Sequence, residues 1–330
     1  MIRLTWLQFR TQAAAAAAVL AIAAIALAVT GPHLARQYTG SGTAACQAHG
    51  ICPGADTARL LSLAVIAVPG IIGLFWGAPL IARELETHSY RLAWTQGITR
   101  TRWLTAKLAV TGAASVAAAG LASLMLTWWA SPIDQASADR WSALSQRDII
   151  PAGAAAFAFT LGVTAGMLIR RTLPAMAVTL AVFTLSQFAM TAAAPHLITP
   201  LRTTTAVSAA ALQSTGVTGD GRLMAVPAPA SIPGAWILSP GQQCGDTAAC
   251  DVITATGQSA ASLPATTACT TAGNGQACDA YIAALHLRQA VTYQPASRYW
   301  IYQWYETAIY LALSLILTAI CFRGIRRRVT

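Results

Sequence analysis

The sequence predicts an all-α integral membrane protein with six transmembrane helices. Hydrophobic residues make up 55% of the 330-residue chain and charged residues 10%, whereas soluble proteins carry about 25% charged residues. Six segments are apolar enough to cross about 30 Å of hydrocarbon, which takes roughly 20 helical residues each. None of them alternates apolar and polar residues as a membrane β-barrel does, and lipid leaves bare backbone unsatisfied, so each must be a helix.

The predicted spans, in chain order, cover residues 12–30, 60–81, 108–130, 151–169, 174–193 and 302–322. The apolar run of the first is longer than the 7–15 residues typical of a signal peptide, so we expect a retained helix. The second contains two prolines and three glycines between residues 69 and 79, and we expect it to be bent or locally unwound. Gly73–Gly77 and Gly162–Gly166 have the GxxxG spacing that permits close helix approach.

The short connection 170–173 predicts that the fourth and fifth spans form an antiparallel hairpin. Residues 194–299 are the largest segment outside the predicted spans, rich in Thr, Ala, Gly and Pro, and within them only 279–292 shows clear helical spacing. The organisation is therefore spans one to five in 1–193, with an inner loop at 83–107, then a partly irregular outer loop at 194–299. The last span and a basic tail follow in 300–330.

Basic residues set the orientation, because cytoplasmic loops carry an excess of Lys and Arg. One face collects thirteen basic residues against only Glu84 and Glu86. They are Arg3, Arg10, the five within 83–107, Arg170, Arg171, Arg323, Arg326, Arg327 and Arg328. We expect a multi-pass protein of the cell membrane with both termini cytoplasmic and 194–299 extracytoplasmic. The net charge of +10 then reflects topology and lipid contact, and not nucleic-acid binding.

Cysteine usage fits this orientation, because six of the seven cysteines fall in predicted outer loops. They are Cys46, Cys52, Cys244, Cys250, Cys269 and Cys278, and only Cys321 lies in a span. An oxidising exterior predicts a local Cys46–Cys52 bridge and two bridges within the last loop, for which three pairings remain open. Free thiols are the alternative. The absence of a CxxC pair argues against structural zinc, and we expect no metal.

The sequence contains no recognisable nucleotide-binding or catalytic motif. A P-loop needs a lysine after glycine, but Lys107, the only lysine, lies between Ala106 and Leu108, so any ATP that the protein uses must be hydrolysed by another subunit. No HExxH or GxSxG occurs, so we expect neither catalytic residues nor cofactors. No ionisable residue lies at mid-depth of a span, which argues against an ion-coupled carrier. Glu306, near the outer boundary, is either an interfacial residue satisfied by water or an ion-paired residue of an outer gate.

The inner loop 83–107 concentrates charge, with five basic residues, the only Lys and two of the three Glu. Apolar residues are interleaved with the charges, which predicts a short amphipathic helix along the membrane surface, with Lys107 snorkelling towards water. A generic positive-inside loop explains the arginines. It leaves unexplained the two glutamates directly after the second span.

Two sequence motifs stand out, one in the inner loop and one at the start of the last span. The first is ARELET at 82–87, followed by RLAWTQ at 91–96 and TRTRW at 99–103; the second is YQPASRYW at 293–300, with Gln303-Trp304 and Glu306. These motifs resemble those of ABC transporter permeases of the type-2 export class, in particular the six-span permeases of GC-rich Gram-positive bacteria. With the helix order they cover most of the chain except the outer loop. His88-Ser89 departs from the Gly-Thr-like pair expected after the glutamates.

The resemblance implies that the inner loop holds a coupling helix, which docks on a separate ATP-binding subunit. Glu84 and Glu86 would make polar contacts with that subunit, and Arg91, Leu92 and Trp94 would form the docking face. The pathway would need a homodimer or a dimer with a related permease. Two alternatives stay open: a non-transporting sensor or scaffold whose outer loop binds a ligand, and an ion-independent secondary carrier.

Overall fold

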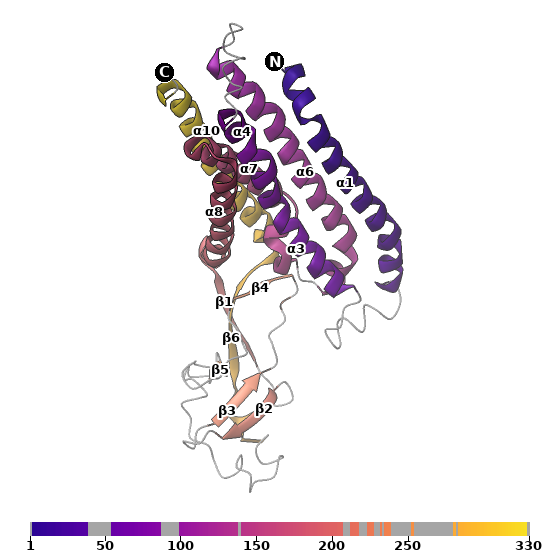
Figure 1. Ribbon diagram of the computed structural model, residues 1–330. Helices are drawn as coiled ribbons and strands as arrows, with labels where there is room; N and C mark the ends of the chain where they lie inside the picture. The colour runs from indigo at the N-terminus through magenta and orange to yellow at the C-terminus, as the bar shows by residue number, and fades with distance from the viewer. Residues whose placement is uncertain are drawn as a thin grey trace. The chain divides into compact units, whose positions relative to one another are not determined.

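The computed structural model in Figure 1 divides the chain into two compact units. The membrane unit comprises residues 1–194 and 299–330, and the strand unit comprises residues 195–298. The structure describes residues 2–38, 54–86, 99–137, 140–206, 212–217, 223–227, 232, 234–238, 252–253, 280–281 and 283–328.

The membrane unit is built of helices, and six helical stretches in the described part of the chain are long and apolar enough to span a membrane. The helices are α1 (Ile2–Tyr38), α3 (Ala55–Ile72), α4 (Ala78–Glu86), α6 (Arg100–Ser137), α7 (Ile150–Ile169), α8 (Thr172–Ala193) and α10 (Tyr299–Arg328). The second stretch runs through α3 and α4 without a break. Each predicted span lies within one of the six stretches, so this part of the prediction is confirmed.

The expected irregularity in the second span is a π-helical turn, η1 (Gly73–Gly77), between α3 and α4. A π-turn inserts an extra residue into the helix and is often found at functional positions. Pro69 lies just before it, inside α3. The span is therefore locally unwound over one turn and continues as a helix on both sides.

The middle of the membrane unit is α7, which packs against α3, α4, α6, α8 and α10. Most of its residues are buried, because the helix is apolar on all sides and rich in small side chains. The two GxxxG pairs meet here: a Cβ on Gly77 would lie 2.6 Å from the backbone O of Phe159, and one on Gly162 2.7 Å from the backbone N of Ala78. Only glycine permits this contact between α7 and the second span.

The connection between α7 and α8 confirms the predicted hairpin. α7 ends at Ile169, Arg170 adopts the left-handed conformation with φ of 59°, and α8 begins at Thr172. Helix C-termini commonly end on such a residue because it turns the chain sharply. Cys321, on α10, is a free, buried cysteine, with its Sγ 3.2 Å from Thr164 Oγ1 of α7.

The strand unit contains β-structure where the sequence indicated a partly irregular loop. β6 (Arg288–Gln294) pairs antiparallel with β1 (Leu201–Ala206), β4 (Trp236–Ile237) and β5 (Val252–Ile253). A separate hairpin joins β2 (Leu212–Val217) and β3 (Leu223–Pro227). Short 3₁₀ turns occur at Trp141–Gln146 (η2), Ala194–His196 (η3) and Ala296–Arg298 (η7).

The helical interpretation of residues 279–292 is wrong for its second half, which belongs to β6. Leu287 and Val291 are both buried, and a spacing of four residues places two side chains on one face of either a helix or a strand. β-branched and aromatic residues in 291–293 favour the strand, and β1 supplies the backbone partner. The all-α description holds for the membrane unit.

Candidate functional site

The ends of several helices gather at one end of the membrane unit, here named the N/C end. Figure 1 shows the start of α1, the end of α10, the end of α4 and the start of α6 at this end. The turn between α7 and α8 lies at the same end, because Thr172 at the start of α8 donates two hydrogen bonds to Glu86 at the end of α4. The opposite end, the far end, carries η2 and the start of α10.

Glu84 of α4 forms an ion pair with Lys107 of α6 at the N/C end. Lys107 is 3% exposed, and its ammonium group also lies 4.8 Å from the centre of the Trp103 ring. The expectation that Lys107 snorkels to water is therefore wrong: α6 begins at Arg100, so Lys107 lies inside the helix, where packing against α4 supplies a carboxylate instead. A buried lysine needs such a partner, because an uncompensated charge in a low-dielectric interior is costly.

Glu86, at the end of α4, holds the start of α8. Its two carboxylate oxygens accept hydrogen bonds from the backbone N–H of Thr172 at 2.8 Å and from Thr172 Oγ1 at 2.7 Å. The first N–H groups of a helix lack intrahelical partners, and negative charge is favourable there. Both glutamates that charge topology left unexplained thus have partners within the chain. Arg91, Leu92 and Trp94 lie outside the described residues.

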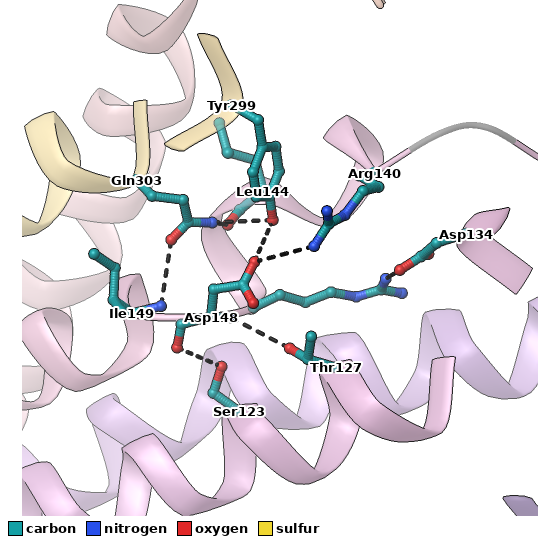
Figure 2. A network of polar contacts seen from close by, with 10 residues as sticks. Ser123, Thr127, Asp134, Arg140, Leu144, Asp148, Ile149, Tyr299 and Gln303 are labelled. Atoms are coloured by element: carbon teal, nitrogen blue, oxygen red, sulfur yellow. Dashed lines mark hydrogen bonds and ion pairs between the residues drawn. The ribbon is translucent and has the colours of Figure 1, made fainter. Parts of the chain in front are cut away.

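The far end contains a buried polar network that joins α6, the segment 140–149 and α10 (Figure 2). Asp148 lies at its centre, where its Oδ2 accepts a hydrogen bond from Tyr299 Oη at 2.7 Å and is 3.9 Å from Arg140 Nη2. The backbone of Asp148 is held by two residues of α6. Ser123 Oγ donates to its carbonyl oxygen, and its N–H donates to Thr127 Oγ1.

Gln303 of α10 extends this network. Its Nε2 donates to the carbonyl oxygen of Leu144 at 3.0 Å and to Tyr299 Oη at 3.1 Å, and its Oε1 accepts from the N–H of Ile149 at 3.3 Å. Because buried backbone groups must be satisfied, this single amide fixes η2 and the start of α7 to α10. Gln303 appears in the sequence only as part of the second family-like motif, and no local pattern marks its role.

Arg147, next to Asp148, is buried and paired with Asp134 of α6. The sequence places both residues in an ordinary outer loop, and nothing in their spacing predicts a buried pair. Trp141 of η2 adds edge-to-face ring contacts with Tyr299 and Tyr302. The connection between α6 and α7 is therefore packed against the last span and is not a solvated loop.

Glu306 lies one turn after Gln303 on α10 and is 2% exposed. Its Oε2 accepts a hydrogen bond from Ser145 Oγ of η2 at 3.2 Å, and its Oε1 is buried without a hydrogen-bond partner among the described residues. The interpretation as an interfacial residue satisfied by water is wrong, because η2 folds over this part of α10. The described residues also include no ion-pair partner for Glu306.

The six cysteines predicted to form disulfides lie outside the described residues. Within the described part of the chain, no group of three or more His, Cys, Asp or Glu side chains is arranged to hold a metal ion.

Comparison with known proteins adds one match. A family model described as ABC-2 membrane transporter related matches residues 17–194, a range that runs from α1 to the end of α8. No curated protein and no solved structure matches the chain.

Proposed function

The chain belongs to the ABC-2 membrane transporter related family, and from this premise we propose that it is the membrane-spanning subunit of an ATP-driven exporter. Family membership and the six apolar helical stretches support a multi-pass transport permease subunit without catalytic activity, and the family implies association with an ABC ATPase. The lack of a P-loop around Lys107 agrees with ATP hydrolysis on a separate subunit. The family-like motifs at 82–103 and 293–306 support a relationship to the six-span permeases of GC-rich Gram-positive bacteria.

We assign the docking of the ATPase to the coupling segment, defined as residues 87–98. The observation that carries this proposal is the anchoring of both flanks of the segment at the N/C end. Glu84 before it pairs with Lys107 after it, and Glu86 holds the start of α8. A force on the coupling segment would then act at once on the second span, α6 and α8.

Glu84 and Glu86 accordingly act as positioning residues in this proposal, since their carboxylates are already engaged within the chain. The docking face itself would consist of Arg91, Leu92 and Trp94. Aromatic and arginine side chains dominate the binding energy of most protein interfaces, and both types are present here.

Export by this subunit requires the N/C end to face the cytoplasm, and the excess of basic residues at that end supports this orientation. The transport pathway would lie between two chains, either identical or closely related. This arrangement is favoured because α7 fills the middle of a single membrane unit and packs against α3, α4, α6, α8 and α10.

Replacing Trp94 with Ala is expected to lower the affinity for the ATPase about 30-fold, the effect of a 2 kcal/mol hot spot. The measurement is titration of the purified ATPase, encoded beside this chain or recovered with it, against the permease in lipid nanodiscs. Trp128→Ala is the matched control, because Trp128 is an exposed tryptophan of α6, distant in sequence from the coupling segment. Equal affinity of the Trp94 variant and the wild type for the ATPase would contradict the proposed role of Trp94 in docking. Failure of the wild type to bind any ATPase would favour the sensor or scaffold alternative.

The orientation predicts disulfides in residues 194–299 and in the first outer loop. Mass spectrometry of the unreduced protein, alkylated before digestion, is expected to find Cys46 linked to Cys52. It should also find Cys244, Cys250, Cys269 and Cys278 joined in two pairs. Cys321 is the internal control, because it is a free cysteine and should be recovered as a thiol after denaturation. Alkylation of all seven cysteines in protein taken from intact membranes would contradict the extracytoplasmic assignment.

A further inference from the structure

The side chain of Glu306 is buried, and its Oε1 has no hydrogen-bond partner among the described residues. In the described part of the chain it is the only carboxylate side chain with a buried oxygen that lacks a hydrogen-bond partner. The other buried acid, Asp148, accepts a hydrogen bond from Tyr299 and lies beside Arg140. Among the described residues, the carboxyl group of Glu306 has a single hydrogen-bond partner, the hydroxyl of Ser145.

The described elements around Glu306 supply no counter-charge. α7, α8 and η2 contain no titratable side chain, and Tyr310, one turn further on α10, donates its hydroxyl to Gln187 of α8. The charged residues that flank η2 are engaged elsewhere, with Arg147 paired to Asp134 and Arg140 beside Asp148. The basic residues described on α6 lie in its first two turns at the N/C end; they are Arg100, Arg102 and Lys107.

A carboxylate ion in these surroundings would be a buried charge with one hydrogen bond and no ion pair. Ionised groups of this kind are strongly disfavoured in low dielectric, and a carboxyl group escapes the penalty by binding a proton. Ionisable residues within membrane spans are rare and mark proton or substrate sites.

We propose that Glu306 is a proton-binding site in the last span. In the described conformation Oε1 carries a proton taken from water, and Oε2 keeps the hydrogen bond from Ser145. Release of that proton to water leaves a carboxylate, which favours conformations in which water reaches Glu306. Such conformations require η2 to separate from α10, because η2 supplies the only bond to the carboxyl group among the described residues. Proton binding and closure of the far end are therefore linked. The site does not depend on the docking of an ATPase.

Infrared spectroscopy of the purified full-length chain in lipid nanodiscs at neutral pH tests the site directly, without any transport assay. The wild type is expected to show the C=O stretching band of one protonated carboxyl group per chain, shifted in D₂O. Glu306→Gln should lose this band completely. Glu86→Gln is the matched control and should retain it, because the Glu86 carboxylate is exposed and accepts two hydrogen bonds from Thr172.

Two further variants complete the experiment. One replaces Glu306→Gln if that variant misfolds, and the other tests the contact with η2. Glu306→Met keeps a similar side-chain volume without an ionisable group, and it should also lose the band. It serves as the test variant if Glu306→Gln does not fold. Ser145→Ala should keep one protonated carboxyl but shift its frequency, because the hydrogen bond to Oε2 is gone. Identical spectra for the wild type and both Glu306 variants would overturn the proposal. A carboxylate band at Glu306, balanced by a bound cation or cationic cargo, would overturn it as well.

Discussion

Replacing Glu84 with Gln is expected to destabilise the membrane unit by about 3 kcal/mol, the scale measured for breaking a buried ion pair. Lys107 is 3% exposed and would keep its charge without a partner. The free energy of unfolding can be measured by titration with sodium dodecyl sulfate in mixed micelles, followed by circular dichroism. Removing both charges in Glu84→Gln/Lys107→Met should restore most of the loss, because the penalty comes from the unpaired ammonium and not from the missing glutamate.

Arg59→Gln is the control for this experiment. Arg59 is an exposed residue of the same span, and substitutions of this kind usually change stability by no more than about 0.5 kcal/mol. If Glu84→Gln lowered the free energy of unfolding by no more than about 0.5 kcal/mol, water or lipid headgroups would be compensating for the charge of Lys107. The two flanks of the coupling segment would then not be joined by the ion pair.

Replacing Gly162 with Ala is expected to cost about 1–3 kcal/mol, the range for overpacking a well-packed interior. The added Cβ would lie 2.7 Å from the backbone N of Ala78 and 3.0 Å from the backbone C of Gly77. Neither is the end of a flexible side chain, so α7 would have to move away from the second span. Gly162→Leu should prevent accumulation of folded protein, measured as the monodisperse fraction in size-exclusion chromatography.

Gly120→Ala is the matched control on α6. Its Cβ would meet only Ala152 Cβ, at 3.8 Å, which is an ordinary van der Waals contact. Because Ala is a better helix former than Gly by up to about 1 kcal/mol, this variant should be neutral or slightly more stable. Equal stability of Gly162→Ala and Gly120→Ala would show that the contact between the two GxxxG pairs is looser than described.

The spans were predictable from the sequence because a membrane makes length and composition sufficient. Lipid forces each apolar segment of about 20 residues to be a helix, so local composition is enough to find it. An irregularity in the second span, though not its π-helical form, could be anticipated for a similar reason, since the glycines and prolines of residues 69–79 weaken a helix locally. The hairpin of α7 and α8 followed from the length of its connection.

The polar contacts were not predictable, because they join residues that are distant in the chain. Glu86 meets Thr172, Gln303 meets Leu144, and Glu306 meets Ser145. No spacing rule connects such residues, and each partner is determined by how two helices pack. The strand β6 shows the same limit, because a spacing of four residues fits both a helix and a strand until β1 supplies hydrogen bonds.

Local composition was enough to identify the membrane class, the six spans and the absence of a P-loop, because these features depend on nearby residues and on the solvent. The same holds for the uneven distribution of basic residues from which the orientation is proposed. The partners of the three glutamates, in contrast, depend on how the helices pack. Glu84 neutralises a buried lysine, Glu86 holds the start of α8, and Glu306 is covered by η2. The state of a carboxylate depends on the charges and hydrogen-bond donors that the fold brings to it, and those come from other segments of the chain.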